Sequence, residues 1–343
     1  MIGPVKNRQM SNDSEFSKMM RAVLFENHQI RIRNVPVPVP VPEEALVKIE
    51  LAGICATDVA LLNGYHDFSG IPGHEFVGRV VSAPERPALE GCRVVADINC
   101  SCGRCDVCRS GNYRHCENRT VLGIRGRSGV FAEYCAIPAA NLRPVPETVG
   151  SEEAVFAEPL AAAMAVGRQV NIAPNSRMAV LGDGKISLLC ALWLRGKTEN
   201  LVLIGRHPEK LAIAAAQGVE TICNASASVN EHLGQSFDGV IEATGRPDGI
   251  NQALSLVRPM GTVVVKTTVH EPSVIDLADL VVREVRLAGS RCGDIHQALE
   301  FMKAKKIRLS SLVEAVYPVE EFEAAFSRSR HPGSRKVLIR MPE

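Results

Sequence analysis

The sequence lacks a marked excess of charge, a long apolar run and an export signal. Its 343 residues carry 39 basic and 38 acidic side chains, so the formal net charge is only +1. That balance gives no electrostatic attraction to nucleic acid or to an anionic membrane. No apolar run approaches the roughly 18 residues that a transmembrane helix needs. Residues 1–19 are polar, with no continuous apolar core, so we expect either a disordered extension or a wrongly assigned start codon upstream of Met20, and not a signal peptide.

These absences predict a cytoplasmic protein whose eleven cysteines stay reduced and are available to metal ions. Four of them lie within residues 100–117 with the spacing C-x2-C-x2-C-x7-C: Cys102, Cys105, Cys108 and Cys116. Such a spacing predicts a tetrahedral cage of sulfur atoms around one structural Zn²⁺, with no open coordination position for chemistry. The alternatives are disulfides or scattered core thiols. Cys100 lies just outside the spacing and is expected to be a spare thiol.

The length predicts about two domains, and the pattern of elements divides the chain. Up to about residue 150 the sequence reads as short strands separated by turns. From 151 to 292, strands alternate with helices of about ten residues, which indicates an α/β domain with a parallel sheet. Residues 293–343 return to a mixed pattern. We therefore expect a discontinuous domain of 20–150 and 293–343, and a second domain of 151–292.

A glycine-containing turn between a predicted strand and a predicted helix, residues 180–187, indicates a dinucleotide site. Gly182 would permit the tight turn, and Gly184 the close approach of the pyrophosphate to the backbone. Lys185 and Ile186 would open the helix whose amino end attracts the phosphates. Ser187 replaces the third glycine of the usual pattern and is small enough for helix–strand packing. The alternative is a plain glycine turn.

The end of the next predicted strand bears on the choice of cofactor. An NAD site usually has Asp or Glu there, which binds the ribose 2′-hydroxyl. This chain has Gly205, Arg206 and His207 instead, with Lys210 one turn into the next helix. Without a carboxylate at this position, these side chains could bind a 2′-phosphate, so we expect a preference for NADP(H) over NAD(H). The alternative is a solvated Arg206 beside a loosely held adenosine.

Three further motifs carry candidate metal ligands: Cys55 after one predicted strand, His74-Glu75 at the start of another, and Glu158 where the second region opens. Taken singly, they could be a core thiol, a satisfied histidine and a carboxylate at a helix amino end. Together with the four-cysteine loop and the glycine turn, in this order, they resemble the zinc-dependent medium-chain dehydrogenases, the superfamily of alcohol, polyol and threonine dehydrogenases. The resemblance runs from about Met20 to the C-terminus.

The resemblance implies a GroES-like catalytic domain, a Rossmann cofactor domain and an active site in the cleft between them. It implies that Cys55, His74 and Glu158 bind a catalytic Zn²⁺, that Glu75 exchanges with water as a ligand, and that Asp58 orients the imidazole of His74. Two zinc ions per chain and a nicotinamide cofactor are thus expected. Relatives are homodimers or homotetramers paired through the cofactor domain, so the resemblance also implies a homo-oligomer.

The chemistry implied is hydride transfer from an alcohol made acidic by an open zinc site. Thr57, two residues after Cys55, would accept the hydroxyl proton. Many relatives extend this proton relay through a histidine at the position of Ala60, and His66 is a possible substitute. Residues 63–68 are expected to line a wall of the substrate cleft, and Thr244 to approach the nicotinamide, although it could also be an ordinary turn residue.

The leading hypothesis is an NADP(H)-preferring, zinc-dependent dehydrogenase acting on a secondary alcohol, a polyol or the corresponding carbonyl compound. The second uses NAD(H) on a polyol, a sugar or an amino alcohol such as threonine. The third, of another class, is a catalytically silent nucleotide-binding protein with a redox-sensing role. The presence of Cys55, His74 and Glu158 together argues against the third.

Overall fold

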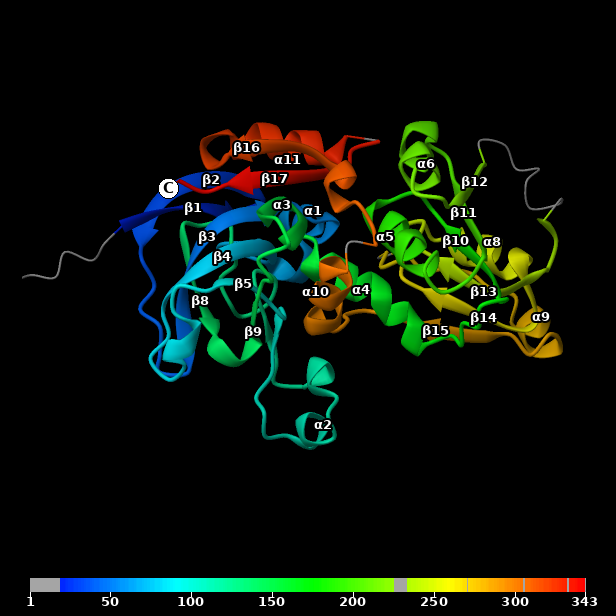
Figure 1. Cartoon of the computed structure of the whole chain (residues 1–343), viewed down its shortest axis with the longest axis horizontal. Coiled ribbons are helices and arrows are strands. Elements are labelled where there is room, and N and C mark those ends of the chain that lie inside the picture. The colour runs from blue at the N-terminus through cyan, green and yellow to red at the C-terminus, as the bar shows by residue number, and fades with distance from the viewer. Residues whose placement is uncertain (1–18, 225–232, 270, 305, 332, 343) are drawn as a thin grey trace, which may run out of the picture.

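The computed structural model describes residues 19–224, 233–269, 271–304, 306–331 and 333–342. They form two lobes, one around a mixed sheet and one around a parallel sheet, with helices α4 (Ala157–Met164), α5 (Lys185–Leu194) and α10 (Ile295–Lys303) between them (Figure 1). The extension expected over residues 1–19 lies outside the described residues except for Met19, which begins the first strand. No helix among the described residues is long and apolar enough to cross a membrane.

The first lobe is built on a seven-stranded sheet that combines strands from the early and the late parts of the sequence. Its order is β16-β17-β3-β4-β5-β9, with β8 also pairing with β3. These strands are β3 (Glu44–Gly53), β4 (Glu75–Ser82), β5 (Arg93–Ala96), β8 (Tyr134–Pro138), β9 (Leu142–Pro144), β16 (Val313–Pro318) and β17 (Lys336–Arg340). Alternate residues of β3 are buried, as expected of a strand with one face on a core. The late strands β16 and β17 thus complete the sheet begun by β3 and β4.

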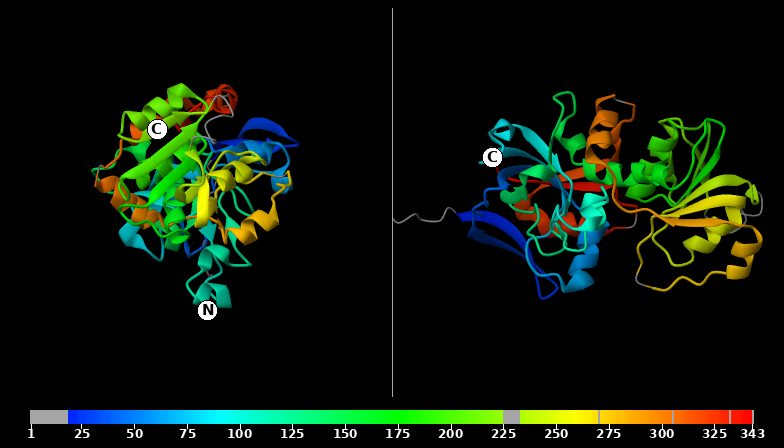
Figure 2. Two further views of the ribbon diagram at one scale, coloured as in Figure 1. Left: turned by 90° about the vertical axis from the view of Figure 1, so that its right-hand side faces the viewer. Right: turned by 90° about the horizontal axis from the view of Figure 1, so that it is seen from below.

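Around this sheet lie a hairpin of β1 (Met19–Glu26) and β2 (Gln29–Pro36), and three short helices, α1 (Ala56–Leu62), α2 (Asp106–Arg109) and α3 (Ser151–Ala154). In helix α11 (Phe322–Arg330), the ring of Phe322 packs against the rings of Phe25 and Phe131. Its centroid lies 6.5 Å from that of Phe25 and 4.9 Å from that of Phe131. The loop that carries α2 and the small ladder of β6 (Asn99–Cys100) and β7 (Thr120–Val121) protrudes from this lobe (Figures 1 and 2).

The second lobe is a doubly wound α/β domain, as the alternating pattern predicted. Its six parallel strands have the order β12-β11-β10-β13-β14-β15. They are β10 (Arg177–Leu181), β11 (Asn200–Gly205), β12 (Glu220–Cys223), β13 (Phe237–Glu242), β14 (Val257–Val265) and β15 (Arg286–Gly289). Met178 and Val180 pack toward α5 and α6 (Pro208–Ala215), whereas Ala179 and Leu181 pack toward α8 (Gly249–Leu256) and α9 (Leu277–Val282).

The order of these strands reverses between β10 and β13, and ligands of such sheets bind outside the carboxyl ends of the strands at that point. The core that contains α4, α5 and α10 also includes Leu51 and Val77 of the first sheet. The two lobes therefore share packed apolar residues beside the place where a dinucleotide is expected.

Candidate active site and metal centres

The first candidate metal centre joins Cys55, His74 and Glu75. Cys55 caps the amino end of α1, while His74 immediately precedes β4 and Glu75 is its first residue. One ligand atom from each residue lies within 4.8 Å of the others. His74 and Glu75 are 3% and 1% exposed, whereas Cys55 is only partly buried. A thiol, an imidazole and a carboxylate are suited to Zn²⁺.

Asp58 holds this group in place from within α1. Its Oδ2 accepts a hydrogen bond from the Cys55 N–H at 2.8 Å, and its Oδ1 lies 3.4 Å from Nδ1 of His74. Both of those facing atoms are buried and have no other hydrogen-bonding partner among the described residues. Burial alone would lower the pKa of His74, but the charges of Asp58 and Cys55 more than reverse this and raise it. A carboxylate on Nδ1 leaves Nε2 as the metal-binding atom, which is the expected arrangement of a zinc-bound histidine.

Glu158 lies in the first turn of α4, beside this group but outside the set within 4.8 Å. Burial raises the pKa of its carboxyl to about 7, with His74 opposing the shift and Glu75 adding to it. The structure therefore brings Glu158 near the predicted ligands, while Glu75 is the carboxylate that directly joins Cys55 and His74.

Lys336 is a residue of this site that the sequence motifs did not reveal. Its Nζ donates a hydrogen bond to Oε2 of Glu75 and a longer one, 3.5 Å, to the Ile54 carbonyl. The side chains of Lys336 and Glu75 are 2% and 1% exposed. Burial by itself lowers the pKa of Lys336, but the Glu75 carboxylate more than offsets this, and the pKa is raised. A lysine directly before the apolar run of β17 was the one signal in the sequence.

The predicted proton relay is only partly assembled. Oγ1 of Thr57 lies 3.7 Å from Sγ of Cys55, so the hydroxyl is beside the metal group. His66 instead stacks on Tyr65, with ring centroids 3.9 Å apart, and lines a cavity of about 460 Å³. The lining of that cavity includes neither Cys55 nor His74. Phe68 and Arg125 also line this cavity, so part of the loop of residues 63–68 faces it.

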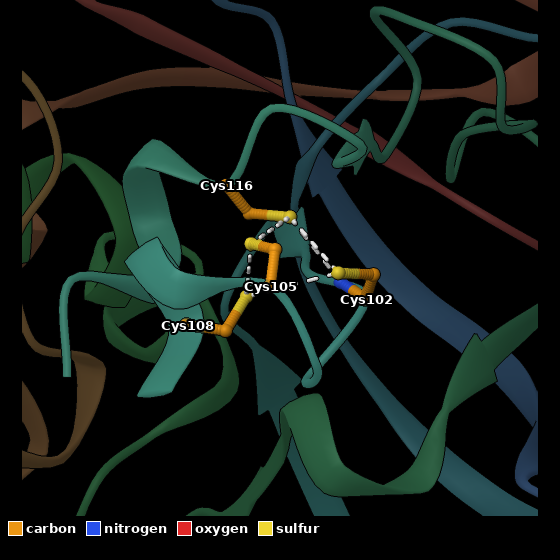
Figure 3. Close-up of side chains that lie close together, drawn as sticks. All are labelled: Cys102, Cys105, Cys108 and Cys116. Atoms are coloured by element: carbon orange, nitrogen blue, oxygen red, sulfur yellow. Dashed lines mark hydrogen bonds between the residues drawn. The ribbon is translucent and has the colours of Figure 1, made fainter. Parts of the chain in front are cut away.

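The four cysteines of the protruding loop converge on one point (Figure 3). Four of their Sγ–Sγ distances are 3.4, 3.5, 3.8 and 4.0 Å. A Zn–S bond of about 2.3 Å gives a tetrahedron with edges of about 3.8 Å, so the four thiols fit one Zn²⁺. Hydrogen bonds from the backbone of Arg104 and Cys105 lower the pKa of the Cys102 thiol to about 6, which favours the thiolate that a metal binds. All eleven cysteines are free, and none of these contacts is a disulfide.

The glycine turn has the geometry of a nucleotide loop. Gly182 has a φ of 111°, in the region that favours glycine, and Gly184 caps α5. Ser187 is fully buried, and its Oγ donates a hydrogen bond to the Ala243 carbonyl at 3.0 Å, so it packs the helix against β13. Lys185 begins α5, and burial followed by the charge of Lys336 lowers its pKa to about 8. Ile186 packs against the shared core.

Thr244 follows β13 and is held by a buried carboxylate. Its N–H and its hydroxyl both donate to Oε1 of Glu242, at 2.8 and 2.7 Å. Glu242 also accepts a hydrogen bond from Thr267 at 2.8 Å. The turn after β13 is thus rigidly hydrogen-bonded at the carboxyl edge of the sheet.

At the end of β11, the structure places a carboxylate that the sequence reasoning overlooked. Asp183, between the two glycines of the turn, reaches across to the amides of Arg206 and His207. It also lies 3.0 Å from Nδ1 of His207 and 3.8 Å from Nζ of Lys210. The expectation of NADP(H) assumed that no carboxylate lay here, and this premise is wrong.

The nucleotide loop and the first metal group face each other across the lobes. One small cavity is lined by Asp183 and Lys185 from the loop and by Phe156 and Lys336 from the side of the metal group. Among known proteins, residues 41–147 match the model of the alcohol dehydrogenase GroES-like domain, and residues 184–304 match that of the zinc-binding dehydrogenases. The chain belongs to the zinc-dependent medium-chain dehydrogenases.

Individual relatives of this superfamily cover nearly the whole chain. The erythritol/L-threitol dehydrogenase of Mycolicibacterium smegmatis is 28% identical over 89% of this chain and 92% of its own. A zinc-binding dehydrogenase of Sinorhizobium meliloti, solved with NADP, is 31% identical with a TM-score of 0.88, covering 94% of this chain and 99% of its own. The alcohol dehydrogenase RspB of Escherichia coli, solved with NADH, is 27% identical with the same TM-score and the same coverage. This medium-chain dehydrogenase is therefore a zinc-dependent, nicotinamide-dependent oxidoreductase acting on alcohols.

Proposed function

We propose that this dehydrogenase oxidises a secondary alcohol of a polyol, or reduces the corresponding carbonyl, at a zinc ion held by Cys55 and His74, with the neighbouring Glu158 as the third ligand. The observation that carries the proposal is the cavity that links the nucleotide loop to Lys336, the residue hydrogen-bonded to Glu75. A cofactor on the glycine turn would extend from this side toward a substrate at the metal group. Hydride would pass from the alcohol carbon to the nicotinamide, and the hydroxyl proton would leave separately.

The residues of the metal site would have separate roles in this reaction. Cys55, His74 and Glu158 would hold a zinc ion, which would supply the positive charge that makes an alcohol more acidic. Asp58 orients His74 and keeps Nε2 free for the metal. Thr57 accepts the hydroxyl proton at Oγ1, beside Cys55. Lys336 holds Glu75 in a buried ion pair, which keeps this carboxylate from competing freely for the metal.

A polyhydroxy substrate is supported by the similarity to a known polyol dehydrogenase. The relative from Mycolicibacterium smegmatis is an erythritol/L-threitol dehydrogenase. For the cofactor, we rank NAD(H) above NADP(H), because Asp183 occupies the end of β11.

The test is a screen of four- to six-carbon polyols, short secondary alcohols and threonine with both cofactors, followed by nicotinamide absorbance and zinc analysis. We expect one zinc in each of the two groups. Cys55→Ser should abolish turnover and remove only one of the two, whereas Cys105→Ser should remove the other. Absence of turnover with every alcohol, in protein that carries both zinc ions and binds NADH, would refute the proposed reaction.

We further propose that two copies of the chain associate through the cofactor lobe. Strand β15 is an unpaired edge of the parallel sheet. Near it, several large apolar side chains are more than half exposed: Val274, Leu277, Val281 and Val282. Exposed apolar groups of this kind mark association surfaces. Light scattering should find a homo-oligomer, and Val281→Lys with Val282→Lys should convert it to monomer. We also propose a cytoplasmic location, because both metal groups need reduced thiols.

A further inference from the structure

The side chain of Asp183 is a buried anion with several hydrogen-bonding partners at the nucleotide site. It is 8% exposed. Its Oδ2 accepts hydrogen bonds from the N–H groups of Arg206 and His207, at 2.5 and 2.8 Å. The carboxylate also lies 3.0 Å from Nδ1 of His207 and 3.8 Å from Nζ of Lys210. Two consecutive backbone amides and two potentially cationic side chains therefore surround one carboxylate.

The space for this carboxylate exists because residue 205 is glycine. A Cβ atom on Gly205 would lie 2.6 Å from Cβ of Asp183 and 2.8 Å from its Oδ2. No side chain at position 205 fits while Asp183 keeps its place. An acid at the end of this second strand is the usual ribose-binding group of an NAD site. Here the acid is supplied by the glycine turn of the first strand and fills the same region.

The groups around Asp183 are those that an anionic 2′-phosphate would require. Adjacent backbone amides at a strand-to-helix turn form an anion-binding concavity. Arginine and lysine side chains strengthen such a site by charge-assisted hydrogen bonds. In this chain the amides of Arg206 and His207 already donate to Asp183, and Lys210 is paired with it. The position is thus already occupied by an anion of the protein itself.

We propose that Asp183 is an internal substitute for the 2′-phosphate and is the residue that makes this dehydrogenase select NAD(H) over NADP(H). The proposal rests on the proposed function only in requiring that the glycine turn binds a dinucleotide. A 2′-phosphate would have to displace a buried carboxylate and would meet its negative charge, whereas a 2′-hydroxyl would not. Burial alone raises the pKa of Asp183, but the hydrogen bonds from His207 and Arg206 more than offset it, so the carboxylate is ionised at neutral pH.

Binding at the adenosine part of the cofactor site can be measured without zinc, substrate or turnover. The probes are 5′-AMP and 2′,5′-ADP, whose binding to the full-length protein is measured by calorimetry or by displacement of NADH fluorescence. The wild type should bind 5′-AMP at least about tenfold more tightly than 2′,5′-ADP, corresponding to about 1.4 kcal/mol. Asp183→Ala should release the two amides and the side chains of His207 and Lys210, and reverse the ratio.

Three further variants keep the test decisive. Asp183→Asn, which keeps the shape and loses the charge, should shift the ratio in the same direction if the alanine variant folds poorly. Adding Lys210→Ala to Asp183→Ala should remove most of the gain for 2′,5′-ADP, because Lys210 is the lysine paired with Asp183. Asp238→Ala is the matched control: Asp238 also accepts a backbone amide, that of Arg177 at 2.7 Å, and pairs with Arg258, but it lies at the start of β13.

The control should leave the ratio unchanged. A wild type that prefers 2′,5′-ADP, or folded Asp183→Ala and Asp183→Asn proteins with the wild-type ratio, would overturn the role of Asp183 while leaving the proposed reaction intact. A wild type that binds neither probe nor NADH would overturn both.

Discussion

Replacing Lys336 with methionine should destabilise the protein far more than the loss of a surface lysine would. The methionine keeps most of the length of the side chain but removes the charge opposite Glu75, and both side chains of this ion pair are almost fully buried. Removing one partner of a buried pair leaves an uncompensated charge and costs about 3–5 kcal/mol. For a domain of 150 to 250 residues, this corresponds to a fall in the melting temperature of about 6–20 °C.

The assay is thermal unfolding of wild type, Lys336→Met, Glu75→Gln and the double variant, all at the same zinc concentration. The double variant should be more stable than the sum of the single changes predicts, because a neutral amide beside methionine leaves no unpaired charge. Lys303→Met is the control, since Lys303 and its partner Glu300 are more than half exposed and such pairs contribute about 0–1 kcal/mol. Additive effects in the cycle, or equal shifts for Lys336→Met and Lys303→Met, would refute the reasoning.

Three other changes test separate parts of the molecule. Thr57→Ala should lower kcat by about 10²- to 10⁴-fold with unchanged zinc content, as measured by steady-state kinetics and metal analysis; unchanged turnover would exclude Oγ1 as the proton acceptor. Cys105→Ser should lower the melting temperature and the zinc content more than it alters the KM for the alcohol, because a zinc ion in the four-cysteine loop would only stabilise the structure. Phe322→Ala should cost about 3–5 kcal/mol in denaturant unfolding, because the ring is fully buried between Phe25, Phe131 and Phe326, and a loss below about 1 kcal/mol would contradict this packing.

The features that the sequence predicted well are formed by residues that lie close together along the chain. The four cysteines lie within one loop, and the glycine turn lies between a strand and the helix that follows it, so their geometry is largely local. The alternation of strands and helices likewise predicted the parallel sheet, because each βαβ unit is a local pattern.

What the sequence did not reveal depends on contacts between distant residues. Lys336 is 261 positions from Glu75, and a buried lysine in an apolar strand has no motif that names its partner. Asp183 is 24 positions from His207 and belongs to a different strand-to-helix turn. The absence of an acid at Gly205 was visible, but its replacement from the neighbouring turn required the three-dimensional arrangement. The expectation of NADP(H) did not take this carboxylate into account, and the preference between the two cofactors stays a prediction.

The pairing of β17 with β3 has a consequence for the order in which the protein is made. Leu338 pairs with Gly53, and Lys336 begins the same late strand. A ribosome therefore makes every strand of the cofactor lobe, the last of which ends at residue 289, before the edge of β3 is covered and before Glu75 meets its counter-charge. The cofactor lobe can fold on the nascent chain, whereas the catalytic lobe must wait until β17 has been made. A chain truncated just before Lys336 should thus keep an intact nucleotide fold and expose an aggregation-prone strand edge.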